Sequence, residues 1–356
     1  MKTGIHDRFG LCGSPTCLVG RQVPLGDDDF GEITLTHMME QAIKDFPKQF
    51  KFRPKIEGGK VKKYKKFLIC GMGGSGQPPQ VLKSIVPELD IIVHKDYGLP
   101  VGDWRKTLVV AMSYSGETEE TISALEEAKE KGLSVAVIAT GGTLIARAKQ
   151  YGFPYVQIPN TGIQPRTATG FLYRALLKLM KQNELLKSSQ DLAKTLGRSD
   201  EEARGRELAR TLQNTIPLIY ASTQNAPLAY MWKIKCNETG KIPAFYNVIP
   251  ELNHNEMNGF DVKDATRGLS EKFHFIFLRD SDDLEKNQTR MDVTAKLYQD
   301  RGLKVTTLAL SGEGRQERIF SSLILGDWTA HYVAQGYGLD SEQVPMIQEF
   351  KRLMVK

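Results

Sequence analysis

The chain has 356 residues, of which 40% are hydrophobic and 25% are charged, and its formal net charge is +6. This composition is ordinary for a globular protein, and no run approaches the ~18 apolar residues of a membrane-spanning helix, so we expect no membrane partner. Lysines and arginines are scattered rather than gathered into a stripe with interleaved aromatic residues, which argues against nucleic-acid binding.

The four cysteines and the first residues bear on the compartment and on metals. Cys12, Cys17, Cys70 and Cys236 match neither a disulfide framework nor a zinc site, so we expect reduced thiols and no bound metal. Residues 1–20 lack the apolar core of a secretory signal, which favours a cytoplasmic protein.

The first half of the chain predicts one α/β domain. Residues 1–35 are rich in Gly, Pro and Asp and predict an N-terminal extension. A domain over 36–187 follows, led by a helix that ends near Pro47. In this domain helical segments alternate with short apolar strands, predicted at 66–70, 90–94, 107–112, 133–139 and 155–157. This alternation indicates a parallel sheet covered on both faces.

The pattern then restarts after a polar linker at 188–214. A second domain over 215–338 has predicted strands at 217–222, 244–248, 272–278 and 303–310. Residues 339–356 predict a C-terminal helix. At about 150 residues per domain, the length also favours two domains. We therefore predict two α/β domains of one type, each a mainly parallel, doubly wound, flavodoxin-like sheet flanked by helices.

A glycine-rich loop follows the first predicted strand. It reads Gly71-Met72-Gly73-Gly74-Ser75-Gly76, which matches the dinucleotide pattern G-x-G-x-x-G. Asp96 lies about twenty residues further on, at the spacing of the acidic residue that binds the ribose of a dinucleotide. An oxidoreductase that uses a nicotinamide cofactor through Gly71, Gly73 and Gly76 is therefore one reading.

A hydroxyl-rich loop, Ser113-Tyr114-Ser115-Gly116-Glu117-Thr118, follows the third predicted strand and enters a helix. Free backbone N–H groups at a helix start, joined by three hydroxyls, form a cradle for a phosphate monoester that needs no metal. Ser115 or Thr118 could instead only cap the helix. Glu117 and its neighbours Glu119 and Glu120 would repel a dianion unless they point away.

The two loops together resemble the SIS domain of sugar-phosphate isomerases. Further segments narrow the resemblance to the bifunctional phosphoglucose/phosphomannose isomerase family; they are Gln164-Pro165-Arg166, Trp232-Lys233, Asn237-Glu238, Pro243-Ala244-Phe245 with Asn247, Pro250 to Glu256, and Glu349-Phe350-Lys351. The resemblance implies two SIS domains, hexose 6-phosphate substrates, no cofactor and a homodimer with a shared active site. The implied activity interconverts glucose 6-phosphate, and possibly mannose 6-phosphate, with fructose 6-phosphate through a cis-enediol(ate).

The resemblance also implies the site residues. The phosphate would bind the loop residues Gly73, Gly74, Ser75, Ser113, Ser115 and Thr118. Glu238 would move the proton between C1 and C2, because one carboxylate can serve both carbons on one face of the intermediate. Arg166 would stabilise the enediolate oxygen. His254, reaching over from the adjacent subunit, and Lys351 would assist ring opening.

The sequence departs from the family at two places. Gln77-Pro78-Pro79 stands where the family has small and apolar residues, and Glu342-Gln343-Val344 replaces a Thr-Pro-Val run thought to help accept both hexose epimers. Use of mannose 6-phosphate therefore stays open. A non-catalytic sugar-phosphate sensor is the other alternative, although the sequence shows no DNA-binding helix-turn-helix of the kind that such regulators often carry.

Overall fold

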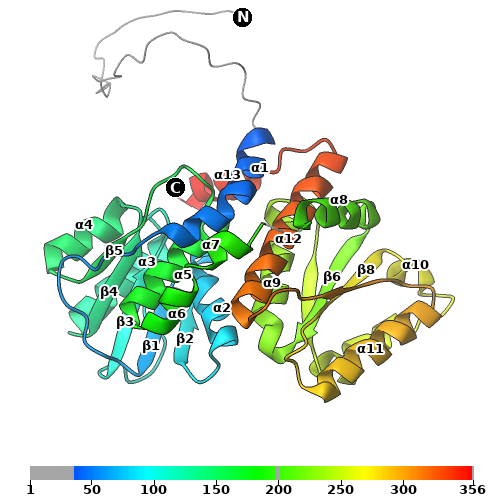
Figure 1. Cartoon of the computed structure of the whole chain (residues 1–356), viewed down its shortest axis with the longest axis horizontal. Coiled ribbons are helices and arrows are strands. Elements are labelled where there is room, and N and C mark those ends of the chain that lie inside the picture. Colours follow the sequence, from blue (N-terminus) through cyan, green and yellow to red (C-terminus); the bar gives the residue numbers. More distant parts are fainter. Residues whose placement is uncertain (1–35, 198–199, 355–356) are drawn as a thin grey trace, which may run out of the picture. The chain divides into compact units, whose positions relative to one another are not determined.

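The computed structural model describes residues 36–197 and 200–354. The predicted extension at 1–35, with Cys12 and Cys17, lies outside the described residues. The described chain contains two parallel sheets flanked by helices (Figure 1). Among the described residues, no helix is both long and apolar enough to cross a membrane.

The first sheet has the strand order β2-β1-β3-β4-β5, and all its pairings are parallel. Its strands are β1 (Lys66–Cys70), β2 (Asp90–His94), β3 (Thr107–Met112), β4 (Ser134–Ala139) and β5 (Tyr155–Gln157). Each agrees with its predicted range within one residue. Every residue of β3 is buried, because helices cover both faces of a central parallel strand.

The helices of this half include several short 3-10 turns, labelled η. They are α1 (Thr36–Asp45), η1 (Phe46–Lys51), η2 (Gly73–Gly76), α2 (Pro78–Ile85), α3 (Glu119–Glu130), α4 (Gly142–Tyr151), η3 (Pro165–Thr167), α5 (Thr169–Leu179) and α6 (Asn183–Ser188). The predicted leading helix changes to a 3-10 turn at Phe46, next to Pro47, which lacks the N–H that an α-helix would use.

The second sheet repeats this topology with one strand fewer, in the order β7-β6-β8-β9. Its strands are β6 (Ile216–Ser222), β7 (Phe245–Ile249), β8 (Phe273–Arg279) and β9 (Lys304–Ala309), again all parallel. Its helices are α9 (Ala226–Glu238), α10 (Arg267–Ser270), α11 (Glu285–Asp300), α12 (Arg315–Gly336) and the turns η4 (Thr223–Asn225), η5 (Glu251–His254) and η6 (Glu256–Phe260). The two-domain, doubly wound fold class is thus confirmed.

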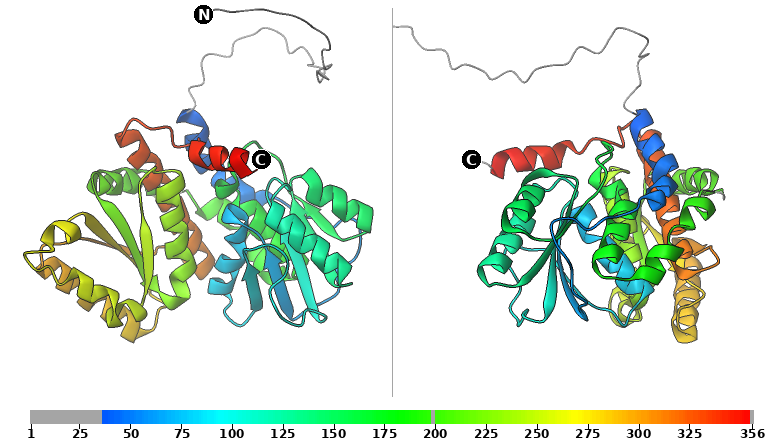
Figure 2. Two further views of the ribbon diagram at one scale, coloured as in Figure 1. Left: turned by 180° about the vertical axis from the view of Figure 1, so that it is seen from behind. Right: turned by 60° about the vertical axis from the view of Figure 1, so that its left-hand side comes forward.

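The segment predicted as a linker, 188–214, carries two helices, α7 (Leu192–Thr195) and α8 (Glu201–Leu212). Helix α8 packs along α12, which also contacts α9 and α2. One hydrophobic core extends from Ile69 of β1 through Phe320 of α12 to Ile276 of β8. Helix α12 is buried nearly along its whole length, and its buried charges are paired: Asp327, for example, binds Lys235 of α9. The chain ends with α13 (Pro345–Met354), which lies on the outside of the fold (Figure 2).

Candidate active site

The loops that follow β1 and β3 meet at one edge of the first sheet and form one wall of a pocket of about 350 Å3. Parallel neighbouring strands end at the same edge, and ligands of doubly wound folds bind there. The pocket is lined by Met72, Gly73, Gly74, Ser75, Ser113, Tyr114, Ser115, Thr118, Glu120, Gln164, Pro165, Arg166, Glu238, Val344, Ile347 and Lys351. Nine of the ten predicted site residues are in this set; His254 is the exception.

The three hydroxyls of the loop after β3 form one cluster. The Oγ of Ser113 lies 2.8 Å from the Oγ1 of Thr118 and 3.4 Å from the Oγ of Ser115. Thr118 stands at the N-cap of α3 without making a side-chain capping bond, so its hydroxyl does not serve the helix. This arrangement favours the anion cradle over simple capping for Thr118.

Two of the three glutamates beside the cradle point away from it. The carboxylate of Glu117 accepts hydrogen bonds from the backbone N and the Oγ1 of Thr143, at 2.8 and 2.7 Å, near the start of α4. Glu119 accepts one from the hydroxyl of Tyr97 at 3.2 Å. Glu120 alone of the three lines the pocket. The repulsion of a bound dianion is therefore much smaller than the sequence suggests.

Close backbone approaches explain two glycines in these loops. A Cβ on Gly74 would stand 2.7 Å from the carbonyl oxygen of Pro165, so only glycine lets η2 reach the segment that carries Arg166. Gly116 has φ +78°, and a Cβ there would stand 2.0 Å from the carbonyl oxygen of Gly141. Ser75 joins the two loops, because its Oγ accepts a hydrogen bond from the backbone N of Tyr114 at 2.9 Å.

Arg166 lines the pocket and is buried, with 5% of its surface exposed. Its guanidinium donates to the Oγ1 of Thr239 at 3.0 Å and to the carbonyl oxygens of Ser341 and Glu342 at 2.9 and 2.8 Å. Burial lowers the pKa of Arg166, and the negative charge of Glu238 opposes that shift. An arginine in this position stays charged and is held rigidly.

Glu238 is the last residue of α9 and comes from the second domain. Its carboxylate Oε2 lies 3.9 Å from Nη1 of Arg166, and its side chain is 28% exposed, so it remains open to the pocket. The adjacent Lys241 donates to the backbone carbonyl oxygen of Glu238 and not to its carboxylate. The carboxylate is thus placed at the helix end, where it faces the pocket and the Arg166 guanidinium.

The segment Ser341–Gln343 brings the C-terminal helix to the pocket. Its carbonyl oxygens accept hydrogen bonds from Arg166, as above, and from Lys241. Val344, Ile347 and Lys351 then line the pocket from α13. The sequence predicted Lys351, but not Thr239, Lys241 or this backbone anchor. The one signal in the sequence is that Thr239 and Lys241 are polar residues close to Glu238; the backbone contact has no sequence signal.

His254 lies outside this pocket in its own chain. It is exposed at the end of η5 and borders a different pocket with Asn253, Met257 and Arg301. The structure therefore brings Glu238, Arg166, Lys351 and the cradle together, but it does not bring His254 to them.

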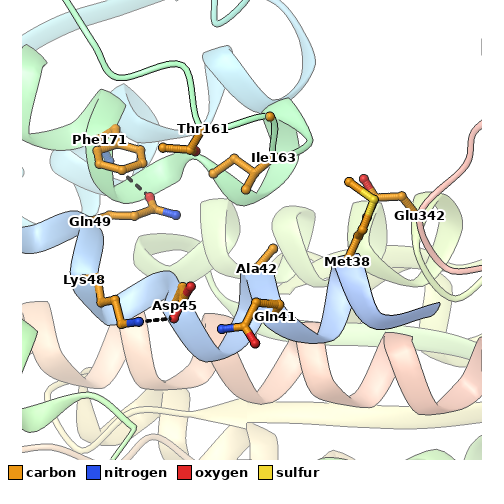
Figure 3. A pocket seen from close by; sticks show the side chains of 11 residues that line it. Met38, Gln41, Ala42, Asp45, Lys48, Gln49, Thr161, Ile163, Phe171 and Glu342 are labelled. Atoms are coloured by element: carbon orange, nitrogen blue, oxygen red, sulfur yellow. Dashed lines mark hydrogen bonds and ion pairs between the residues drawn. The ribbon is translucent and has the colours of Figure 1, made fainter. Parts of the chain in front are cut away.

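A third pocket, of about 370 Å3, lies beside the Arg166 segment and contains none of the predicted site residues (Figure 3). Gln49 crosses its floor, donating to the carbonyl oxygen of Thr167 at 2.7 Å and accepting from the backbone N of Gly170 at 3.0 Å. These bonds hold the turn after Arg166 against η1. The 3-10 turn η1 thus fixes the segment that follows Arg166.

The geometry disfavours a dinucleotide at the glycine-rich loop. The helix after it, α2, begins with Pro78 and Pro79, which lack the N–H groups that bind a pyrophosphate. A 3-10 turn, η2, also separates the helix from β1. Among residues 36–197 and 200–354, no cluster of three or more His, Cys, Asp or Glu could hold a metal ion.

Comparisons with known proteins identify the family of this chain. Residues 104–179 match the SIS domain, and residues 201–354 match the bacterial phospho-glucose isomerase C-terminal SIS domain. A bifunctional phosphoglucose/phosphomannose isomerase of Aquifex aeolicus is 33% identical over 82% of this chain and 91% of that protein. A D-glucosamine-6-phosphate 4-epimerase of Sulfolobus acidocaldarius is 34% identical, over 55% of this chain and 64% of that protein.

Solved structures show the same fold. A hypothetical protein of Thermus thermophilus superposes with a TM-score of 0.67 at 16% identity, covering 91% of this chain and 90% of that one. At this identity the likeness speaks for the fold alone. The family follows from the sequence match over most of both chains and from the two matching domains. The chain belongs to the bifunctional phosphoglucose/phosphomannose isomerase family.

Proposed function

We propose that this protein is an aldose–ketose isomerase that interconverts glucose 6-phosphate with fructose 6-phosphate. Mannose 6-phosphate is the second substrate to test. One observation carries the proposal: a single pocket is lined both by the hydroxyl cradle and by the Arg166–Glu238 pair, whose charged atoms are 3.9 Å apart. A sugar held by its phosphate would therefore present its reacting carbons to a carboxylate and a fixed cation.

The hydroxyl cradle would bind the phosphate of the substrate and take no part in the proton transfers. Ser113, Ser115 and Thr118 would donate hydroxyl protons to phosphate oxygens, and free N–H groups at the start of α3 would add their dipoles. Because the phosphate does not change during isomerisation, these contacts stabilise the ground state and the transition state equally.

Glu238 and Arg166 would carry the isomerisation. In the aldose-to-ketose direction the Glu238 carboxylate takes the proton from C2, a C1–C2 double bond forms, and the electron pair of the C1 carbonyl moves to its oxygen. Arg166 stabilises the resulting charge. Glu238 then returns its proton to C1, while the proton of the C2 hydroxyl passes to the negatively charged C1 oxygen, so that C2 becomes the carbonyl and C1 carries a hydroxyl.

Ring opening must come first, and we assign it to Lys351 together with His254 of a second subunit. The position of Lys351 in the pocket supports its part of this assignment, and the part of His254 follows from the family resemblance, because His254 borders a different pocket in its own chain. Histidine exchanges protons near neutral pH, as ring opening requires. The site would then be shared between two subunits.

The direct test is turnover of fructose 6-phosphate by purified protein in EDTA, with glucose 6-phosphate and mannose 6-phosphate measured separately. We expect glucose 6-phosphate to form, because no step uses a metal. Binding without turnover would favour the sugar-phosphate sensor. Quenching of tryptophan fluorescence by micromolar NADH, with no response to sugar phosphates, would favour the oxidoreductase.

Complementation tests the shared site. Glu238→Gln and His254→Gln chains, each inactive alone, should regain about a quarter of wild-type activity when mixed and allowed to exchange, because half the dimers then contain one intact site. No recovery, with exchange confirmed by mass spectrometry, would place both groups on one subunit.

A further inference from the structure

The pocket beside the Arg166 segment, here called the Gln49 pocket, is a second cavity of ligand size. Its volume of about 370 Å3 lies in the range of small-molecule sites, and it shares no lining residue with the active-site pocket. Apolar side chains form much of its lining, namely Met38, Ala42, Ile163 and Phe171. The proposed isomerisation uses none of these residues.

Glu342 is the unusual member of this lining. It is 3% exposed, yet within the described part of the chain no hydrogen bond or ion pair reaches its carboxylate. Its backbone is bonded, because its N–H donates to the carboxylate of Asp340 at 2.7 Å and its carbonyl oxygen accepts from Arg166. Figure 3 shows the side chain at the end of the pocket near Met38. A buried carboxylate is costly unless a donor or a cation meets it, so Glu342 indicates a ligand.

The charged side chains that line the Gln49 pocket leave one negative charge unbalanced. Nζ of Lys48 lies 2.6 Å from Oδ1 of Asp45, so these two neutralise each other (Figure 3). Glu342 is the remaining charged residue of the lining. Burial lowers the pKa of Arg166 and of Lys241, and the charge of Glu342 opposes both shifts, but these cations bind the segment through its carbonyl oxygens. A ligand with one positive charge would therefore suit the pocket.

We propose that the Gln49 pocket binds a small organic cation in which an ammonium group is joined to an apolar group. The ammonium would donate to the carboxylate of Glu342, in a charge-assisted hydrogen bond, and the apolar group would contact Ala42 and Ile163. The site lies outside the proposed reaction and does not depend on it. Because the carbonyl oxygen of Glu342 accepts from Arg166, the bound cation would also restrain the segment that holds this arginine.

The first experiment titrates the full chain with two probes in a calorimeter. Benzylammonium carries one ammonium group and one ring, and benzyl alcohol is its neutral counterpart. We expect a Kd of about 1 mM or below for benzylammonium and at least about 10-fold weaker binding of benzyl alcohol. Glu342→Gln should weaken benzylammonium binding at least about 10-fold, and it keeps the carbonyl oxygen that binds Arg166. The matched control Glu238→Gln removes the carboxylate of the other pocket and should bind benzylammonium as the wild type does.

A second variant tests the apolar part of the site. Ala42→Leu adds methylene groups to the wall of the pocket and should weaken benzylammonium binding at least about 5-fold. Urea titrations check that both this variant and Glu342→Gln are folded. A wild-type chain that binds no benzylammonium would overturn the inference. Equal affinity for the two probes, or unchanged benzylammonium binding by folded Glu342→Gln, would do the same.

The second experiment uses hydrogen exchange to locate the bound probe. With saturating benzylammonium, peptides covering 161–163 and 338–347 should exchange at least about 5-fold more slowly, because a ligand of the folded state suppresses local opening. Glu342→Gln should lose this protection. Protection confined to 113–118 would place the probe in the active-site pocket and overturn the inference. Neither experiment measures turnover, so a protein that does not isomerise hexose phosphates would remove the proposed function and leave this site standing.

Discussion

The two sheets end in loops of opposite chemistry. Their strand orders make β1 equivalent to β6 and β3 equivalent to β8. After β3 the chain presents Ser113, Ser115 and Thr118 to a pocket. After β8 it presents Asp280, Asp282 and Asp283, and arginines of α12 bind two of these carboxylates.

The carboxylate cluster closes the second sheet edge. Asp280 is fully buried, 2.6 Å from Nη1 of Arg315 and 3.1 Å from Nε of Arg318. Arg315 also donates to the carbonyl oxygen of Ser84 on α2, at 2.7 Å, and so joins the two domains. Carboxylates repel a phosphate, whereas hydroxyls donate to it. The corresponding sheet edge is therefore the proposed ligand site in the first domain, whereas in the second domain internal ion pairs close it.

The largest expected effect tests whether Glu238 is the catalytic base in the pocket at the edge of the first sheet. Glu238→Gln keeps shape but removes the proton acceptor, so kcat should fall by about 10³-fold or more while KM changes little. The coupled assay with fructose 6-phosphate measures both. Glu130→Gln, an exposed glutamate at the end of α3, is the control and should behave as wild type. Retained turnover in Glu238→Gln would remove this residue as the base.

The second effect concerns the buried ion pairs of Asp280 with Arg315 and Arg318. Asp280→Ala leaves Arg315 and Arg318 without their shared buried partner, so the free energy of unfolding should fall by about 3 kcal/mol in urea titrations. The KM of the folded enzyme should not change. The surface pair Arg279–Asp292 offers a control, because Asp292→Ala should cost under about 1 kcal/mol. Equal losses of unfolding free energy in the two variants would mean that the buried ion pairs stabilise the fold no more than a surface pair does.

The third effect compares the hydroxyls of the two edges. Replacing Ser113 and Ser115 together by Ala should raise KM about 10-fold or more and change kcat little, because phosphate contacts act on ground and transition states alike. Ser222, the last residue of β6, and Thr223, the first of η4, lie at the corresponding edge of the second sheet and serve as the comparison pair. Their replacement by Ala should leave KM at the wild-type value. An unchanged KM in the first variant would end the case for the cradle.

The smallest effect is the dependence of stability on pH that two buried histidines cause. Burial lowers the pKa of His274 on β8 and of His331 on α12 below the ordinary 6.5. The unfolded chain then binds more protons than the folded one below about pH 6.5, so stability falls as pH drops through that value. The loss cannot exceed about 1.4 kcal/mol per pH unit for each histidine. Hydrogen exchange at pH 7 and 5.5 should show it in the second domain, and His331→Asn should reduce it. Equal protection at both pH values would contradict the prediction.

The strands and most helices were predictable because their signals are local. Apolar runs of about five residues between helical segments indicate buried parallel strands, and nine such runs match the nine strands of residues 36–197 and 200–354. The polar segment 188–214 shows the limit of that reasoning. Helix α8 within it has a low mean hydropathy, yet Leu208 and Leu212 are buried against the domain, and tertiary packing decides its place.

The sequence by itself determined the α/β class and the two loops at one sheet edge, since each depends on short segments with their own spacing. Nine of the sixteen residues that line the pocket were predicted, Glu238, Arg166 and Lys351 among them through the family resemblance. Only the tertiary structure decided that Glu238 of one domain meets Arg166 of the other, that Glu117 points away from the cradle, and that His254 lies outside the pocket. Contacts between distant segments depend on how α9, α12 and the segment before α13 pack. No local pattern records that packing.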